Sequence, residues 1–197
     1  MPATPTPNVD ATKIQFASNG YVYMAPAVGA TLPTVVGDGK ASPSGYKSLG
    51  YVSDAGVTIT PTINTDPVNV WQSAVPVLFN VTSAQFAIAV TFTETNINTT
   101  ELFYGAQWVE VEDAGQPSGT FRLDLSSTPG LQEISLVIDW GQGDNLNRVV
   151  IPRAMVAERG AITLHRTSNQ EYQLTIDALD ANGTLGYVLT NQDMSGS

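Results

Sequence analysis

Several kinds of residue are missing or scarce in this chain of 197 residues. There is no cysteine, which excludes disulfides and thiolate metal sites. There is one histidine, His165, which leaves little material for a histidine-based catalytic centre. Charged residues are only 13% of the chain, about half the usual share in soluble domains. Small polar residues must therefore cover much of the surface, which suits exposed β-structure or a surface buried in an assembly.

The few charges are mostly acidic, with 18 acidic residues against 8 basic ones and a net charge of −10. Proteins that bind nucleic acid by neutralising phosphates need clustered lysine and arginine, so this class is not expected. An acidic protein can still stand beside DNA and repel it. No apolar run reaches the roughly 18 residues that a membrane-spanning helix needs, so no membrane partner is expected. The N-terminus also lacks the basic and apolar regions of a signal peptide, and secretion is not expected.

The length suits one domain with extended arms. Residues 1–10 hold three prolines and no apolar periodicity, which predicts an extended N-terminal arm. We expect one β-domain over residues 11–190 and a C-terminal tail over residues 191–197. Within the domain, residues 29–45 are rich in glycine, proline and serine and predict a long loop. Loops of more than about 12–15 residues in compact domains are uncommon and tend to be functional.

Alternation of apolar and polar residues predicts a mainly β fold. Residues 86–92 carry an apolar side chain at every second position and small or polar ones between, which predicts a long half-buried strand. Pro61, inside a strand expected over 56–65, indicates an edge strand or a bulge. Regular short spacing of strands is typical of a β-sandwich or partial barrel. Further strands are expected at 13–16, 21–25, 68–71, 75–81, 107–112, 120–126, 133–140, 148–151, 154–158, 161–166, 171–179 and 185–190.

One short α-helix is expected before Gly105. Asn98 is the predicted N-cap, Glu101 follows three residues later as in a capping box, and Gly105 ends the helix. Near the C-terminus, Asn182-Gly183 predicts a tight hairpin turn between the last two strands.

Candidate catalytic residues are few and poorly supported. His165, expected on a strand, has no nucleophile motif to serve, so a structural role is expected. Glu110 and Glu112 project from one face of a predicted strand. Such a pair could serve glycoside hydrolysis or bind a metal, but it is more typical of a solvated face.

Other motifs also favour structural interpretations. The stretch 180–183 resembles the middle of a calcium loop, but its first and twelfth ligand positions would be Ala178 and Leu189. The glycine-rich segments 37–40 and 141–144 lack phosphate-loop spacing and predict turns. We therefore expect no enzymatic activity, no cofactor and no metal. Three tryptophans could form a carbohydrate platform, but their apolar neighbours favour packing in a core or an interface: Trp71, Trp108 and Trp140.

Four stretches, in this order and spacing, carry a resemblance to a known family. They are "GYVSDAG" followed by "VTITPTINTDPVNVWQ" (50–72), "FAIAVTFTETNINTTELFYG" (86–105), "LVIDWGQGDNLNRVVIP" (136–152) and "GAITLHRTSNQEYQLTIDAL" (160–179). Together they resemble the major tail tube proteins of bacteriophages with long non-contractile tails, especially phages of actinobacteria. The resemblance covers about residues 11–190. The loop 29–45 departs from the family pattern because it is longer and richer in proline.

The resemblance implies a β-sandwich or partial barrel flanked by a short helix. It also implies an assembly in the virion, in which rings of six subunits stack into a hollow tube through which the viral genome leaves. The implied partners are the tape measure protein, the distal tail or baseplate proteins and the tail terminator proteins. The subunit would be made in the host cytoplasm, and DNA would pass through the lumen without specific binding.

The implied tube gives the acidic balance a role. Six copies at −10 carry a formal charge of −60 per ring (6 × −10). Carboxylates in the lumen would repel phosphates over a Debye length of about 8 Å at physiological salt. Four acidic residues in or beside the strongest predicted strands are candidates to face the lumen, and each could equally face a neighbouring subunit: Asp54, Asp66, Glu94 and Asp139.

Three alternatives stay open. The first is another virion or injection-system β-protein, such as the inner tube of a contractile system or a capsid decoration protein. The second is a carbohydrate-binding β-sandwich module that uses the tryptophans. The third is a β-sandwich hydrolase whose site is assembled from distant residues.

Overall fold

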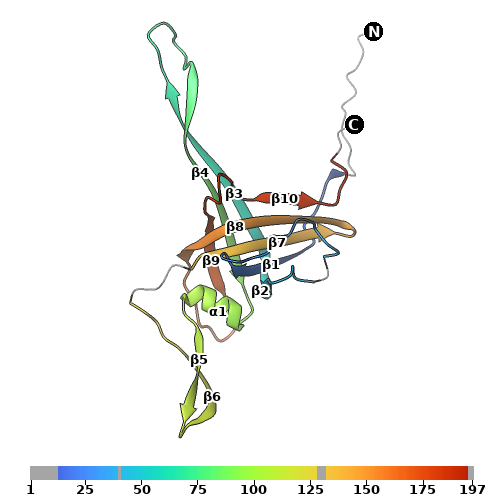
Figure 1. Ribbon diagram of the computed structural model, residues 1–197, viewed down its shortest axis with the longest axis vertical. Coiled ribbons are helices and arrows are strands. Elements are labelled where there is room, and N and C mark those ends of the chain that lie inside the picture. The colour runs from blue at the N-terminus through green and yellow to red at the C-terminus, as the bar shows by residue number, and fades with distance from the viewer. Residues whose placement is uncertain (1–12, 40, 128–131, 195–197) are drawn as a thin grey trace.

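Antiparallel strands dominate the computed structural model, which describes residues 13–39, 41–127 and 132–194. The expected N-terminal arm, residues 1–10, and the last three residues of the expected tail lie outside these ranges. Figure 1 shows a curved central sheet, one helix beside it and two hairpins that project from opposite ends. The elements are β1 Asn19–Pro26, β2 Lys47–Ser48, β3 Val52–Val68, β4 Leu78–Phe92, α1 Ile97–Tyr104, β5 Trp108–Asp113, β6 Gln116–Leu123, β7 Ile134–Gln142, β8 Asn145–Arg159, β9 Tyr172–Ala178 and β10 Tyr187–Thr190.

The central sheet has the order β2-β1-β7-β8-β9-β4-β3, and β10 pairs with β8. Every pairing in it is antiparallel. The sheet curls far enough for β1 to contact β3, although the two strands lie near opposite ends of the strand order. The sheets are not closed into a barrel. The prediction of a mainly β fold with one short helix is confirmed.

The main core lies against one face of the curled sheet. The period-two pattern of 86–92 is confirmed, because Ile88, Val90 and Phe92 are buried. Alternate residues of the neighbouring strands and two helix residues complete this core. Its further buried members include Val22, Leu102, Phe103, Leu136, Ile138, Val149, Ile151, Leu174 and Ile176.

The opposite face of the sheet has a second, smaller core. Val137 and Val150, from β7 and β8, are fully buried there beside Tyr23 of β1. The loop 29–45 packs on this face, and its Ala30 and Leu32 contact the second core. The loop predicted from composition therefore lies on the sheet and covers a face that would otherwise be exposed.

Helix α1 begins and ends with local hydrogen bonds. The N-cap is Asn96, whose side chain accepts a hydrogen bond from the Thr99 amide at 2.9 Å. Gly105 ends the helix with φ of 69°, a left-handed conformation that glycine adopts without steric cost. The predicted cap, Asn98, was wrong by two residues, because it lies inside the first turn and donates to the Ser48 carbonyl instead.

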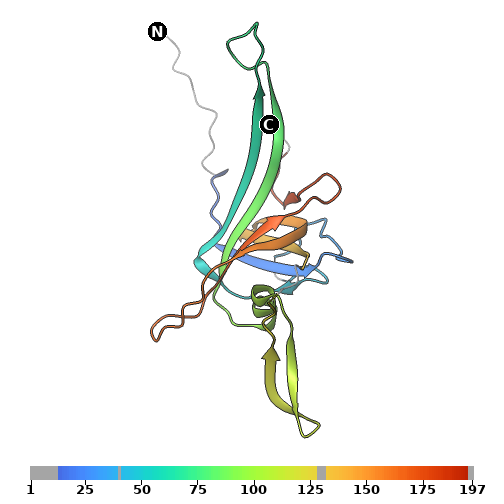
Figure 2. The same cartoon turned by 90° about the vertical axis from the view of Figure 1, so that its left-hand side faces the viewer.

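Two hairpins extend away from the core. The pairing of β3 with β4 continues to Val68 and Leu78, well past the last pairing of β4 with β9 at Ala87. We call residues 61–85 the β3–β4 arm. Figure 2 shows this arm above the sheet and the β5–β6 hairpin below it. Pro61 lies on β3, which is the edge strand of the sheet, as its sequence context predicted.

Some strand predictions were wrong. Residues 14–16 and 161–166 are irregular, and 69–72 form the turn at the end of the arm. The strands expected at 148–151 and 154–158 form one strand, β8, because Pro152 lies near an irregularity of the register where the ladder tolerates it. A turn does occur at Asn182-Gly183, both with positive φ, but β10 pairs with β8 and not with β9.

Candidate assembly surface

The β3–β4 arm is a long apolar surface that no other described element of the chain covers. Nearly every side chain from Pro61 to Gln85 is exposed. Ile63, Phe79 and Val81 are each at least 60% exposed, although residues of this type are normally buried. Contiguous exposed apolar surface of this kind marks interaction sites in soluble proteins. Asp66 is the only charged residue of the arm, so charge does little to keep it apart from other chains.

Strand pairing explains why the arm forms. Pro61, Ile63 and the core residue Ile59 lie on one side of β3, opposite Phe86, Ala84 and Ile88 of β4. The apolar side of the sheet therefore continues from the core into the arm. The other side carries Thr58, Thr60, Thr62 and Asn64, and the Asn64 amide donates a hydrogen bond of 2.8 Å to the Ser83 hydroxyl.

The outer edge of β3 is a second feature suited to assembly. Val52–Val68 pairs with β4 on one side, and within the described chain no strand pairs on the other side. An exposed edge offers a row of unpaired amides and carbonyls to a strand of another chain. Natural sheets usually protect such an edge with charge, proline, bulges or short length. This edge is 17 residues long and has two charged residues, Asp54 and Asp66, and two prolines, Pro61 and Pro67, so it is only partly protected.

The β5–β6 hairpin is the second projecting element. Trp108 fixes its base, because the indole nitrogen donates to Thr100 at 2.8 Å and the Trp108 amide donates to Glu101 at 3.0 Å. Glu110 and Glu112 are exposed on this hairpin, and the Glu110 carboxylate accepts from the Gly119 amide. Its ion pair, Arg122 with Asp124 at 2.8 Å, is also exposed. The hairpin therefore carries solvated carboxylates, as expected for this pair of glutamates.

In contrast to both hairpins, the second face of the sheet holds a buried ion pair. Arg148 of β8 forms two hydrogen bonds with the Asp139 carboxylate of β7, each of 2.6 Å. Its third nitrogen donates to the carbonyl of Val35 at 2.8 Å. The hydrogen bond with Asp139 raises the pKa of Arg148. Arg148 thus neutralises a buried carboxylate and ties the loop 29–45 to the sheet.

Tyrosines surround this ion pair. Burial raises the pKa of Tyr23, and the Asp139 charge raises it further. Burial also raises the pKa of Tyr46, whose hydroxyl lies 2.7 Å from the Ser135 hydroxyl. Tyr187 donates to the Pro33 carbonyl at 2.7 Å and so adds another link to the loop. We call Tyr23, Tyr46, Asp139, Arg148 and Tyr187 the Arg148 cluster.

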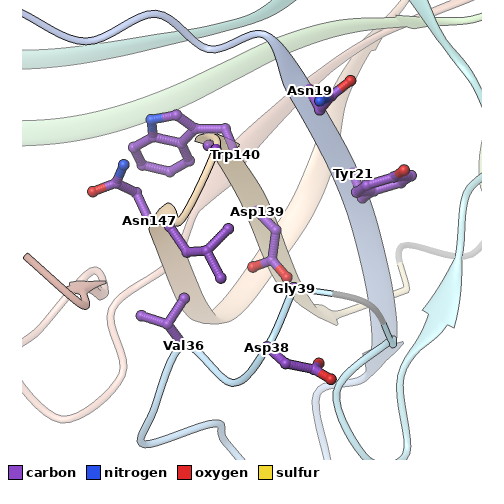
Figure 3. Close-up of a pocket in the computed structure, with 11 residues that line it drawn as sticks. Asn19, Tyr21, Val36, Asp38, Gly39, Asp139, Trp140 and Asn147 are labelled. Carbon is purple, nitrogen blue, oxygen red and sulfur yellow. The ribbon is translucent and has the colours of Figure 1, made fainter.

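A pocket of about 320 Å³ opens beside the cluster. Figure 3 shows Asn19 and Tyr21 on β1, Asp139 and Trp140 on β7, and Val36, Asp38 and Gly39 from the loop. Its two carboxylates belong to Asp38 and to Asp139, which is neutralised by Arg148. Among the described residues, no group of three or more potential metal ligands comes together. The pocket has no histidine or cysteine among its described lining residues.

The predicted lumen candidates lie in different surroundings. Asp54 and Asp66 are exposed on β3, at its beginning and near its end. Glu94 follows β4, and its carboxylate accepts from the Tyr51 amide and the Asn96 side chain. Asp139 is only 7% exposed and is held by Arg148, so it has little free charge to offer a channel. Asp54 and Asp139 line one groove, the four do not form a single cluster among the described residues, and their lumenal role stays a prediction.

The other candidate residues do not form a site. His165 lies in an irregular segment, not on a strand, and its Nδ1 lies 3.0 Å from the Thr167 hydroxyl and accepts from the Thr167 amide at 3.4 Å. Asp180 accepts from the Gly183 amide within the turn that was expected there. Trp71, Trp108 and Trp140 lie on the arm tip, β5 and β7, and no ring contact joins them among the described residues.

A model of phage tail tube proteins matches residues 7–196, nearly the whole chain. The chain belongs to the phage tail tube protein family. No curated protein sequence matches it. Two solved structures are similar in outline: a chain of the "virion of native gene transfer agent (GTA) particle" and a chain of the "anti-feeding prophage (AFP) baseplate, 6-fold symmetrised". The first is 11% identical with a TM-score of 0.43 and covers 77% of this chain and 92% of its own. The second is 10% identical with a TM-score of 0.47 and covers 94% and 97%.

This tail tube protein is thus a structural component of the virion tail.

The sequence analysis missed the pairing of Asp139 with Arg148, although the signal was present. The two-residue turn Gly143-Asp144 places residue 139 opposite residue 148, which is the register observed. It also missed the arm, because alternation along 56–92 does not show where the supporting sheet ends. Among the described residues no helix is long and apolar enough to cross a membrane.

Proposed function

We propose that this tail tube protein assembles into rings of six that stack into a hollow tube, and that viral DNA passes through the tube into the host. The observation that carries the proposal is the β3–β4 arm, whose apolar side chains are exposed and whose outer strand edge is unpaired among the described residues. In an isolated protein such an exposed arm contributes little to folding stability, whereas neighbouring copies can bury its apolar surface. Hydrophobic burial contributes roughly 25 cal/mol per Å² of apolar surface.

Sheet extension explains how copies join within a ring. The free edge of β3 can pair with the free edge of the short strand β2 at the other end of the sheet of a neighbour. Such a contact is head-to-tail, and it closes into a ring when the rotation between copies divides the circle. Closure removes the exposed edges that would otherwise cause disordered aggregation.

The proposed tail is of the long non-contractile type found in siphophages, including actinobacterial phages. The tape measure protein would occupy the lumen during assembly, distal tail or baseplate proteins would start the tube, and terminator proteins would cap it. DNA would move past a lumen that repels it. Asp54, Asp66, Glu94 and Asp139 are the candidates for lumenal carboxylates, and Asp66 is the best suited because it is exposed and forms no ion pair among the described residues.

Electron microscopy of the concentrated purified protein tests this function. We expect hollow tubes or rings with sixfold end views, because the arm and the β3 edge must find partners. Phage particles that carry Asp66→Lys should form normal tails and release DNA more slowly, since a lumenal cation attracts phosphate. Asp66→Asn is the matched control and should have a smaller effect. A strictly monomeric protein at high concentration contradicts the assembly, and unchanged ejection by Asp66→Lys contradicts the lumenal assignment.

A further inference from the structure

A groove of about 410 Å³ lies at the beginning of β3. Its walls come from the start of β1, from the first residues of β3 and from Ile138, Asp139 and Trp140 of β7. Val57 and Ile59 are half-buried and give it an apolar wall, while the exposed Asp54 contributes a carboxylate. The groove lies where β1 and β3 approach without pairing, so it follows from the failure of the sheet to close.

Trp71 stands at the other end of the same hairpin. It lies in the turn at the arm tip and is 99% exposed, the highest value among the exposed large hydrophobic residues. Tryptophan is the side chain most enriched at the energetic centres of protein interfaces. When buried, its indole N–H needs an acceptor, and the groove offers the exposed Asp54 carboxylate beside an apolar wall, while its second carboxylate, Asp139, is already held by Arg148.

A chain cannot place this tryptophan in its own groove. Ile59 lines the groove, and the paired strand runs from there to Val68 before the tip begins. Nine residue steps at about 3.3 Å each hold the tip roughly 30 Å away. The partner must therefore be another molecule.

We infer that the arm tip of one copy, led by Trp71, binds in the groove of a second copy of this chain in the adjacent ring. This inference rests on the proposed function and names the contact between its rings. Each copy gives a tip and receives one, which is a head-to-tail contact that repeats without closing. Repetition of that kind extends a stack of rings into a tube.

Chemical complementarity supports a second copy as the occupant. The tip, residues 69–77, carries no charge, so it brings no carboxylate toward Asp54. Its apolar residues, Val70, Val75 and Val77, are exposed around the indole and can cover the groove rim. The Asp54 carboxylate would accept the indole N–H, which assigns Asp54 to a subunit contact and not to the lumen.

The absence of cysteine makes a direct cross-linking test possible. Gln72→Cys places a thiol beside Trp71, and Ser53→Cys places one in the groove. Disulfides form only when the two Cα atoms come within about 7 Å. Mild oxidation of the assembled double variant should give a ladder of covalent multimers that continues beyond six chains. The control pair, Gln72→Cys with Ser118→Cys on the β5–β6 hairpin, should give no ladder.

Three results decide the inference. A ladder beyond six chains supports it, because contacts between rings do not close. A ladder that ends at six places the contact within a ring and overturns it, and tubes without a selective cross-link also overturn it. Trp71→Ala should raise the protein concentration needed for tube formation at least tenfold. Trp108→Ala, which changes a tryptophan outside this contact, should leave the cross-linked ladder in place. If wild-type protein forms no tubes or rings at all, it is the proposed function that fails.

Discussion

Strands β3 and β4 run through both the sheet body and the β3–β4 arm, yet their apolar side chains are buried in the body and exposed in the arm. In the body, Ile88 and Val90 of β4 are buried beneath neighbouring strands and the helix. In the arm, Phe79 and Val81 of the same strand are about 60% exposed. The alternation of side chains is similar in both parts, and the difference is only whether another element of the chain covers the apolar side.

The treatment of charge shows the same contrast. The body contains a buried Asp139–Arg148 pair, with side chains 10% and 5% exposed, whose hydrogen bonds hold a loop in place. The arm has one charged residue and no ion pair among its described residues. Within one chain, therefore, the body is complete and the arm is not. The body should determine stability and the arm should determine assembly.

Removing Arg148 should have the largest effect on the body. Arg148→Ala leaves the Asp139 carboxylate buried without a partner, which costs about 3–5 kcal/mol of unfolding free energy. Denaturant unfolding of dilute monomeric protein measures the loss. Arg153→Ala is the control, because its pair with Glu133 is more than 40% exposed on both sides and such pairs contribute roughly 1 kcal/mol or less. Equal losses for the two variants would contradict the structural role of the buried pair.

Matched truncations of aliphatic residues test the contrast directly. Leu136→Ala removes a fully buried side chain and should lower the unfolding free energy by about 2–5 kcal/mol. Ile63→Ala, on the arm, should change the stability of the monomer by less than about 0.5 kcal/mol, as surface substitutions usually do. The same arm variant should weaken tube formation, measured by light scattering against concentration. A large loss of monomer stability from Ile63→Ala would show that the arm is not an independent assembly element.

The helix cap should give a smaller effect, confined to the body. Asn96→Ala removes the acceptor for the Thr99 amide and should cost about 1 kcal/mol in denaturant unfolding. Asn98→Ala removes only an exposed hydrogen bond to Ser48 and should cost less. A larger loss of unfolding free energy for Asn98→Ala than for Asn96→Ala would indicate Asn98 as the cap. Neither variant should change the protein concentration at which tubes form.

Local sequence signals predicted much of the body. The alternation of 86–92, the glycine that ends α1 and the turns at 141–144 and 182–183 follow from rules that act over a few residues, and the structure has all of them. Errors arose where the local signal was ambiguous. The spacing of Asn98 and Glu101 predicted Asn98 as the cap, whereas the observed N-cap is Asn96.

Long-range pairing was beyond local reasoning. The turn at 182–183 predicted a hairpin of the last two strands, yet the final strand pairs with β8, because that edge was open beside the second core. The segment 161–166 was expected to be a strand, but it is irregular and joins neither sheet of the described chain. Strand propensity measures how well a residue type fits a half-buried sheet. It does not predict whether a neighbouring strand is available to pair.

The sequence by itself determined the β character, the lack of thiol and histidine chemistry, the acidic balance and the resemblance to tail tube proteins, since each depends on residue type and local order. Tertiary structure alone decided which apolar strand segments are covered, which carboxylate meets Arg148 and where the sheet fails to close. These depend on contacts between residues far apart in the chain, such as β1 with β7 and β4 with β9. The arm and the groove, the two features that we assign to assembly, became visible only at that level.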